Sequence, residues 1–205
     1  KEERIELAPA PRELSGFARE VGKTFTVSVE LDPPKGISTQ KIMEGAKLLK
    51  ESGIRVVNIA DSPMARVRMS CIAMATLARQ IGLDVVMHFT CRDRNRMALQ
   101  SDLLSACSLG IDNVLLLTGD HLNLGDHPSA KAVFDLDSVQ LLSLARGLNQ
   151  GHDMMGHELT QSTALALGAV VNPNFQPLDL QLLKMEKKIA QGAQFFQTQA
   201  VYDPK

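Results

Sequence analysis

Ser108-Leu-Gly-Ile-Asp-Asn-Val-Leu-Leu-Leu-Thr-Gly-Asp120 joins the end of a helical pattern to an apolar run that finishes in a carboxylate. A glycine directly after a helix adopts the left-handed conformation that turns the chain back toward a sheet. The apolar run that follows is typical of a strand buried on both faces. The same order of helix, glycine and strand recurs roughly every 30 residues, which predicts successive βα units on a parallel sheet.

Six apolar runs predict six parallel strands, at residues 25–30, 56–61, 85–88, 114–120, 165–172 and 195–199. The helices between them are expected at residues 40–51, 65–80, 95–109, 138–148 and 178–191. In a parallel α/β barrel, active sites lie at the carboxyl ends of the strands. Each run ends in a side chain capable of chemistry, so we expect these residues to converge on one site: Glu30, Asp61, His88, Asp120, Asn172 and Gln199.

The predicted fold is an α/β (β/α)8 TIM barrel, of which about six βα units are visible. A closed barrel takes about 250 residues, whereas this chain has 205. We expect residues 23–205 to form a partial barrel whose last two units lie beyond Lys205. Residues 1–22 are charged and contain prolines, which predicts a linker or N-terminal arm. Two long connections are expected, residues 119–137 on the active face and residues 149–162 at the opposite end.

The composition is that of a globular protein and argues against several classes of partner. Hydrophobic residues make up 44%, charged residues 22%, and the net charge is -1. The chain has no basic stripe, no Trp and one Tyr, which argues against nucleic-acid binding. No apolar run approaches the ~20 residues of a membrane span. Three cysteines without a CxxC pair favour a reducing cytoplasm over a disulfide framework.

The ends of the first and fourth runs carry the most informative side chains. Glu30 ends an apolar run, where partial burial raises a carboxyl pKa toward the range of a general acid. The alternative is an ion pair of Glu30 with Lys35 or Arg66. Asp120 follows Gly119, which allows close approach of a flat ligand. Its carboxylate suits hydrogen bonds to a heterocycle, and equally suits an ordinary turn.

Other polar residues carry weaker signals. His88 lies in an apolar run, where a buried core histidine is the commoner interpretation. His152 and His157 have poor spacing for zinc and lack an acidic helix partner, so no metal site is predicted. Lys188 belongs to a basic helix face, for which solvation is favoured over phosphate binding. Neither the dinucleotide-binding glycine motif nor the P-loop motif occurs.

A set of motifs in order resembles the 5,10-methylenetetrahydrofolate reductases. They are Glu30-Leu-Asp-Pro-Pro34, the third run with His88, Leu117-Thr-Gly-Asp120, and Lys188-Ile-Ala-Gln-Gly-Ala193 followed by Gln197-Thr-Gln199. The resemblance covers nearly the whole chain. Further stretches resemble the branch of reductases fused to homocysteine methyltransferases and found in acetogenic bacteria: Asn58-Ile-Ala-Asp-Ser-Pro63, Gly125-Asp-His-Pro128 and Phe134-Asp-Leu-Asp-Ser-Val-Gln140.

The resemblance implies a flavoprotein that reduces 5,10-methylenetetrahydrofolate to 5-methyltetrahydrofolate in one-carbon metabolism, within a methionine or acetyl-CoA pathway. Glu30 matches the family's acid, which protonates the folate so that its five-membered ring opens. Asp120 matches the aspartate beside flavin and pterin, and Gln199 matches a folate-contacting glutamine. FAD contacts are implied at Ala60, His88, Thr118, Gly119, Asp120, Asn172 and Lys188.

The resemblance also implies partners: NAD(P)H or another reductant, a methyltransferase domain or partner subunit, and a homo- or hetero-oligomer. Two positions depart from the family pattern. Thr118 stands where many members have Arg, and Asn172-Pro-Asn-Phe-Gln176 stands where many have a Tyr-Pro-Glu-x-His-like run. Two alternatives are a cofactor-free lyase or aldolase, disfavoured because no Lys ends a strand for a Schiff base, and a catalytically silent barrel that serves as a subunit of a larger complex.

Overall fold

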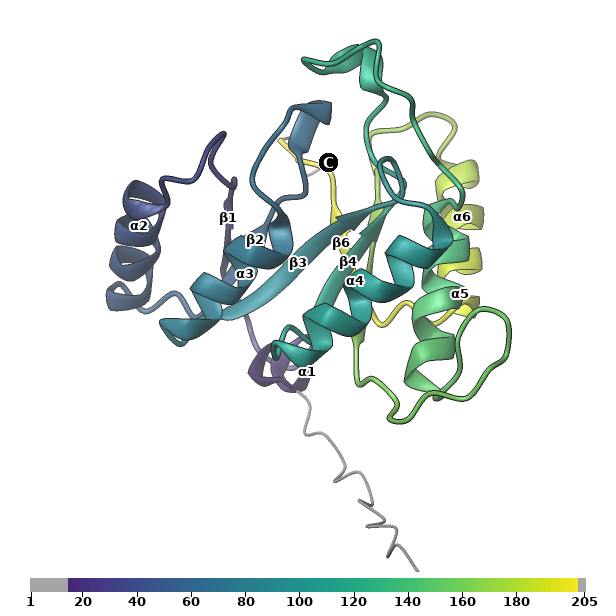
Figure 1. Ribbon diagram of the computed structural model, residues 1–205, viewed down its shortest axis with the longest axis horizontal. Coiled ribbons are helices and arrows are strands. Elements are labelled where there is room, and N and C mark those ends of the chain that lie inside the picture. Colours follow the sequence, from purple (N-terminus) through teal and green to yellow (C-terminus); the bar gives the residue numbers. More distant parts are fainter. Residues whose placement is uncertain (1–14, 203–205) are drawn as a thin grey trace, which may run out of the picture.

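The computed structural model describes residues 15–202 as a parallel α/β half-barrel (Figure 1). The six strands of the sheet lie in sequence order, and every neighbouring pair is parallel. They are β1 (Ser28–Leu31), β2 (Val56–Ile59), β3 (Asp84–Thr90), β4 (Asn113–Leu117), β5 (Ala166–Val171) and β6 (Phe195–Thr198). The predicted α/β class, a partial TIM barrel, is confirmed.

Helices connect the strands and cover the outer face of the curved sheet. They are α2 (Gln40–Glu51), α3 (Cys71–Gln80), α4 (Arg96–Ser108), α5 (Ser138–Asn149) and α6 (Leu178–Ala190). A short helix α1 (Gly16–Glu20) lies at the amino ends of the strands, and the 3₁₀ turns η1 (Pro63–Ala65) and η2 (Leu122–Leu124) lie in loops at the carboxyl ends. None of the helices within residues 15–202 has both the length and the hydropathy that a membrane crossing requires.

Four of the predicted helices, α2, α4, α5 and α6, agree with the structure to within one residue at each end. The fifth, α3, begins at Cys71 and not at residue 65 as predicted. The reason is local: Ser62, Met64 and Ala65 have φ of 45°, 53° and 54°, which a right-handed helix excludes. The first predicted strand also begins too early, because β1 starts at Ser28 and Phe25 is 97% exposed.

Glycines close the returns from helix to strand, as predicted. Gly53, Gly82, Gly110 and Gly192 follow α2, α3, α4 and α6, and their φ values lie between 79° and 105°. Side chains with a Cβ are disfavoured in this left-handed region, and glycine is not. The long segment before α5 lies over the carboxyl ends of the strands, and the segment between α5 and β5 lies at the opposite end (Figure 1).

The outer face of the sheet forms the larger core. Its side chains pack under the helices and are nearly all inaccessible; they include Val57, Ile59, Val85, Met87, Phe89, Val114 and Leu116. The alternate side chains point into the barrel, because successive residues of a strand face opposite sides. Toward the amino ends of the strands these form a second apolar cluster: Phe17, Val56, Val86, Leu115, Ala166 and Phe195.

Helix α1 closes the barrel from below. The Phe17 ring packs edge-on against Phe195, with ring centroids 5.1 Å apart and planes at 79°. The Phe17 N–H donates to Asp84 Oδ2 at 2.9 Å, and Ser15 caps the helix while its hydroxyl donates to Asn113. The apolar cluster therefore fills the barrel interior near the amino ends of the strands, and the interior near their carboxyl ends stays open.

The prediction of a linker or arm at residues 1–22 lies largely outside the described residues, and the domain boundary stays a prediction. The expectation of two further βα units also stays a prediction. Apolar side chains are exposed at both edges of the half-barrel, on the approach to β1 and on α6: Phe25, Val27, Leu178, Leu180, Leu182, Leu183 and Ile189.

We expect Phe17→Ala to lower the free energy of unfolding by about 3 kcal/mol, the range for truncation of a buried phenylalanine. Phe17 is 6% exposed, and its loss leaves a cavity against Phe195. Urea unfolding of the full chain measures the change. Met155→Ala is the matched control, because Met155 is 76% exposed and should change stability by less than about 0.5 kcal/mol. Equal losses in both variants would show that α1 is not part of the core.

Candidate active site

A cavity of about 470 Å³ opens at the carboxyl end of the half-barrel. All six strands or the residues directly after them contribute to its wall. With one exception, the residues predicted from strand ends and from the family resemblance line this cavity. Those that line it are Glu30, Ala60, Asp61, His88, Thr118, Gly119, Asp120, Lys188 and Gln199. The residues that end or follow the parallel strands therefore lie around one cavity.

Asn172 is the exception, and the expectation that it converges with the other strand-end residues is wrong. Its Oδ1 accepts a hydrogen bond from the Asn174 N–H at 3.0 Å, which uses the side chain inside the turn after β5. Asn172 does not line the cavity. Its role in flavin binding stays a prediction.

Glu30 stands at the open edge of the barrel, on β1. Desolvation raises the pKa of its carboxyl, and the negative charge of Asp32 raises it further. Among the ion pairs of residues 15–202 none involves Glu30, so neither Lys35 nor Arg66 is its partner here. A carboxyl with a raised pKa at a cavity wall has the property that a general acid needs.

His88 is buried in the wall, on β3, with 9% of its surface exposed. Burial lowers its pKa to about 4, although the nearby Asp61 charge acts in the opposite direction. The imidazole is therefore neutral at pH 7. Its Nε2 is buried and has no hydrogen-bond partner among the described residues. An unpaired polar atom in the wall of a cavity is the kind of group that a bound ligand satisfies.

Asp61 accepts hydrogen bonds from neighbouring residues of the cavity wall. Its Oδ2 accepts from the Thr90 N–H at 2.9 Å, from the Thr90 hydroxyl at 3.0 Å and from Arg94 Nη1 at 2.7 Å. The Arg94 guanidinium lies 4.5 Å from the Phe89 ring centroid and also bonds Asp102 at 2.9 Å. These contacts join the ends of β2 and β3, so Asp61 shapes the site and has little capacity left for a ligand.

Gly119 and Asp120 line the cavity just after β4. Gly119 has φ 98°, and an added Cβ would lie 3.0 Å from Thr90 Cβ and 3.1 Å from Arg92 Cβ. Only glycine fits without displacement of its neighbours. Asp120 Oδ2 accepts the Met64 N–H at 2.8 Å, which ties the strained loop after β2 to the loop after β4.

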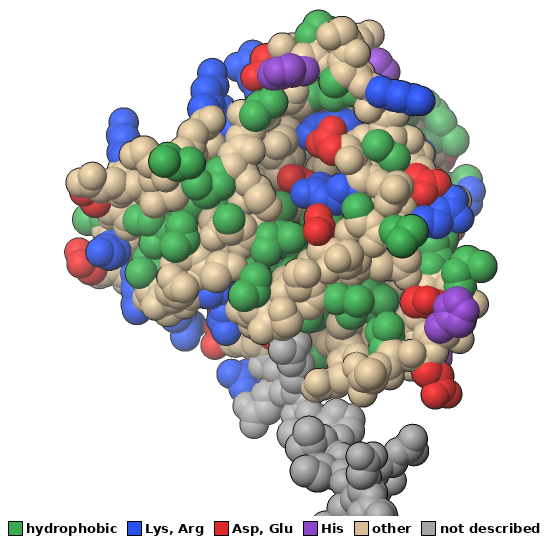
Figure 2. Space-filling model, in the orientation of Figure 1, with side chains coloured by type: hydrophobic (Ala, Val, Ile, Leu, Met, Phe, Trp, Pro, Cys, Tyr) green, Lys and Arg blue, Asp and Glu red, His purple; other side chains and the backbone are tan. Residues whose placement is uncertain are grey.

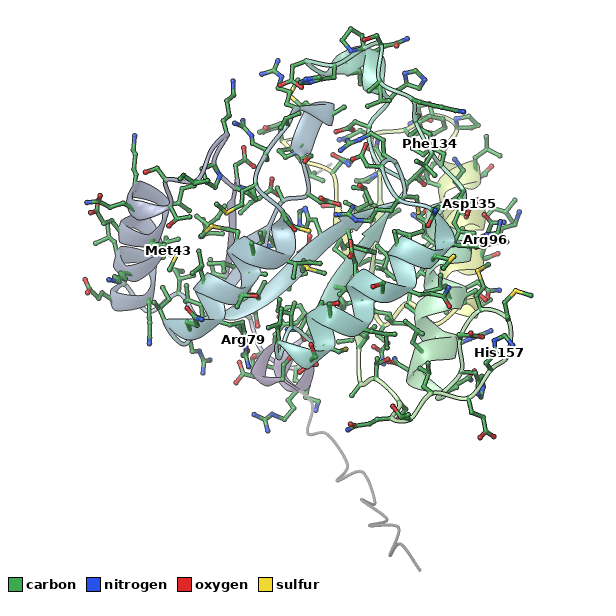
Figure 3. All side chains as sticks on the ribbon, in the orientation of Figure 1. Met43, Arg79, Arg96, Phe134, Asp135 and His157 are labelled. Carbon is green, nitrogen blue, oxygen red and sulfur yellow. The ribbon has the colours of Figure 1, made fainter. Side chains whose placement is uncertain are left out.

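The base of the long loop is fixed by an ion pair that Figure 3 labels, between Arg96 at the start of α4 and Asp135. Arg96 Nη2 and Nε lie 2.7 and 3.0 Å from the two carboxylate oxygens. The bonds from Arg96 lower the pKa of Asp135 to about 2. Figure 2 shows acidic and basic side chains interspersed over this upper part of the face, above the strand ends.

Lys188 reaches the cavity from α6, and its ammonium donates to the Val170 carbonyl. Burial lowers its pKa, and the like charge of Lys184 lowers it further. The Gln199 N–H donates to the Val171 carbonyl at 3.0 Å, so the pairing of β5 with β6 continues one residue beyond the end of β6.

Gln197 also lines the cavity, although its motif was quoted without a predicted role for this residue. Its signal was available, because it alternates with Gln199 along one strand and so faces the same side.

No metal site is found within the described residues, where no group of three or more His, Cys, Asp or Glu side chains is arranged to hold an ion. His157 instead bonds Asp153 at 2.8 Å.

The fold and the cavity define an α/β-barrel protein with its candidate site at the carboxyl ends of the strands. The sequence model of methylenetetrahydrofolate reductase matches residues 17–205. The chain belongs to the methylenetetrahydrofolate reductase family, which confirms the resemblance seen in its motifs.

Solved structures with the same fold include an uncharacterized protein from Clostridium thermocellum that binds two copies of 5-methyl-5,6,7,8-tetrahydrofolic acid. It is 17% identical, with a TM-score of 0.57, over 87% of this chain and 55% of that one. A 2,3-dimethylmalate lyase of the PEP mutase/isocitrate lyase superfamily is 10% identical, with a TM-score of 0.60, over 91% and 62%. At these identities the likeness shows the fold alone, and the chain spans less than two thirds of either structure. A search of curated proteins finds no match.

We expect the stability of the protein to fall as the pH falls from 6.5 toward 4. In this window the unfolded chain binds a proton at His88, with an ordinary pKa of 6.5, and the folded chain does not, with a pKa of about 4. The contribution is up to about 3 kcal/mol, at about 1.4 kcal/mol for each pKa unit. Urea unfolding at several pH values should show a smaller loss in His88→Gln. The same pH slope in both proteins would mean that His88 titrates normally.

Proposed function

We propose that this chain is part of a flavin-dependent enzyme that reduces 5,10-methylenetetrahydrofolate to 5-methyltetrahydrofolate. Family membership over residues 17–205 supports this reaction. The observation that carries the proposal is the gathering of Glu30, His88, Asp120 and Gln199, which match functional positions of that family, around one cavity. The methyl-folate bound by the Clostridium thermocellum protein supports a folate as the ligand class.

The cavity fits a flavin on two grounds. His88 offers a neutral imidazole with an unpaired Nε2, and Gly119 leaves the wall open to a flat ring. The residues that would hold FAD are Ala60, His88, Thr118, Gly119, Asp120 and Lys188. When bound, FAD would take electrons from NAD(P)H or another reductant and supply the hydride for the folate carbon.

Each polar group of the wall has a proposed task. Because its pKa is raised, Glu30 stays protonated to a higher pH than an ordinary carboxyl. It donates this proton to the folate nitrogen so that the ring opens. The cation that results is stabilised by the Asp120 carboxylate, which lines the same cavity. Gln199 orients the pterin through its amide. Together these groups position the substrate and supply the proton.

The departures from the family pattern change which side chains supply positive charge. The Thr118 hydroxyl accepts from the Ser138 N–H at 3.2 Å, so it supports the start of α5 and brings no cation. Lys188 brings a cation from α6 in the same cavity. We propose that Lys188, which matches a flavin-site position of the family, supplies positive charge to the flavin in this cavity without the help of an arginine at position 118.

The proposal extends to the protein's surroundings. None of the three cysteines, which all lie within the described residues, forms a disulfide, and all three are buried. Burial raises the pKa of the Cys91 thiol to about 12, so this thiol is unreactive. This fits a reducing compartment such as the cytoplasm. A methyltransferase domain or partner subunit, and a homo- or hetero-oligomer, remain part of the proposal.

A lyase-type barrel is the second candidate, and Lys188 is the observation that favours it. Its ammonium lies in the cavity wall with a lowered pKa, which is a property of Schiff-base lysines. The lyase has no use for a flavin, so a test of flavin binding separates the two candidates.

We expect the purified full-length protein to be yellow and to keep the visible absorption bands of oxidised flavin through gel filtration. Gly119→Ala should lose this flavin, because the added Cβ meets Thr90 and Arg92 at about 3 Å. Gly45→Ala is the matched control and should keep it, since nothing lies within 4 Å of a Cβ at that position. A colourless wild-type protein that takes up no added FAD would rule out the reductase.

We expect Glu30→Gln to keep flavin content and flavin reduction but to slow folate reduction by ~100-fold or more, the effect of a lost general acid. Stopped-flow measurement of the two half-reactions separates these steps. Glu51→Gln is the control, because Glu51 lies exposed at the end of α2, away from the cavity. Normal folate turnover in Glu30→Gln would remove Glu30 from the mechanism.

A further inference from the structure

A hydrogen bond crosses the inside of the half-barrel. Gln197 on β6 donates from Nε2 to Asn58 Oδ1 on β2 at 2.8 Å, and Asn58 donates from Nδ2 to the Ser28 hydroxyl on β1 at 2.9 Å. In the sheet, β2 and β6 are separated by β3, β4 and β5. Their side chains meet only because the sheet curls, so this bond, called here the amide bridge, spans the barrel interior.

The amide bridge lies beside two residues of the proposed site. Asn58 pairs in register with Glu30 on the neighbouring strand. Gln197 precedes Gln199 by two residues, so both side chains face the cavity, and both line it. One end of the bridge is therefore attached to the strand next to the proposed acid, and the other end to the strand that carries the proposed folate contact.

The bridge is a partly buried polar contact at the boundary between the apolar cluster and the cavity. Asn58 is 6% exposed, and an amide buried there without a partner would destabilise the fold. Phe195, two residues before Gln197 on the same face, belongs to the apolar cluster below. Apolar side chains at positions 58 and 197 would extend that cluster toward the carboxyl ends of the strands. The two amides instead fix the distance between β2 and β6 through their hydrogen bond.

Within residues 15–202, β6 pairs with β5 along one side and with no strand along the other. The position of Gln199 relative to Glu30 thus rests on the curl of the whole sheet and on the amide bridge. The bridge does not require one orientation of the amides, because each carries both a donor and an acceptor and the pair can reverse together.

We propose that Asn58 and Gln197 are positioning residues that set the width of the cavity between Glu30 and Gln199, so that both reach the same folate. The proposal rests on the proposed function, since it concerns the folate part of that site. A displacement of about 1 Å between groups that act on one substrate lowers rates by about 100-fold. The bridge acts through Glu30 and Gln199 and makes no chemical step itself.

The test is a double-mutant cycle in the full chain with Asn58→Leu, Gln197→Met and the double variant, which keep side-chain size and remove the amides. The dissociation constant of 5-methyltetrahydrofolate is measured by titration of the oxidised protein, and KM and kcat are measured separately. Each single variant should weaken folate binding about 10-fold and raise KM. The double variant should bind folate no more weakly than the single variant with the lower affinity. Flavin affinity should not change.

Asn113→Leu is the matched control. Asn113 is another buried interior amide, 2% exposed, bonded to the Val85 carbonyl at 2.9 Å on the closed side of the barrel. It should lower the melting temperature and leave folate binding unchanged.

Additive losses in the cycle, unchanged folate binding in the single variants, or an equal loss in Asn113→Leu would overturn the positioning role. Wild-type protein that binds neither flavin nor folate would instead contradict the proposed function.

Discussion

Parallel pairing of each strand with its sequence neighbour is the constraint from which the rest of the structure follows. Strands that run in one direction need a crossover between them, and the helices that supply it must cover one face of the sheet. The opposite face then curls inward, and all carboxyl ends reach the same rim. The inner face is filled from below by Phe17 and Phe195, so the space that remains lies where those ends meet.

Burial sets the protonation of the cavity wall. It raises the pKa of Glu30, lowers that of His88 to about 4 and lowers that of Lys188, so each of these groups shifts toward its neutral form. Asp61 and Arg94 lie behind these groups, where Asp61 accepts hydrogen bonds from Thr90 and from Arg94. The wall therefore combines a hydrogen-bonded ion pair with neighbouring groups whose pKa values are shifted toward the neutral form.

The two walls of the cavity differ in how they are supported. The wall from β2 to β4 is backed by the main core and by the Asp61–Arg94 pair, which joins the ends of β2 and β3. The wall at β6 has a strand on one side only within residues 15–202, and α6, which packs against β5, has no buried residue. The amide bridge from Asn58 to Gln197 links the weakly supported wall to the strongly supported one.

The fold class, four helices to within a residue, the helix-closing glycines and the location of the cavity could be predicted from local sequence patterns. These follow from local periodicity and from strand direction, which brings Glu30, His88, Asp120 and Gln199 to one rim. Tertiary structure decided the late start of α3, the use of Asn172 inside a turn, the engagement of Asp61 by Arg94 and the contact of Asn58 with Gln197. Two of these, the engagement of Asp61 by Arg94 and the amide bridge, join residues far apart in the chain, and whether such partners meet depends on how far the sheet curves and on which loop backbone lies nearest. The period of a hydrophobic pattern predicts neither the curvature of the sheet nor the position of a loop.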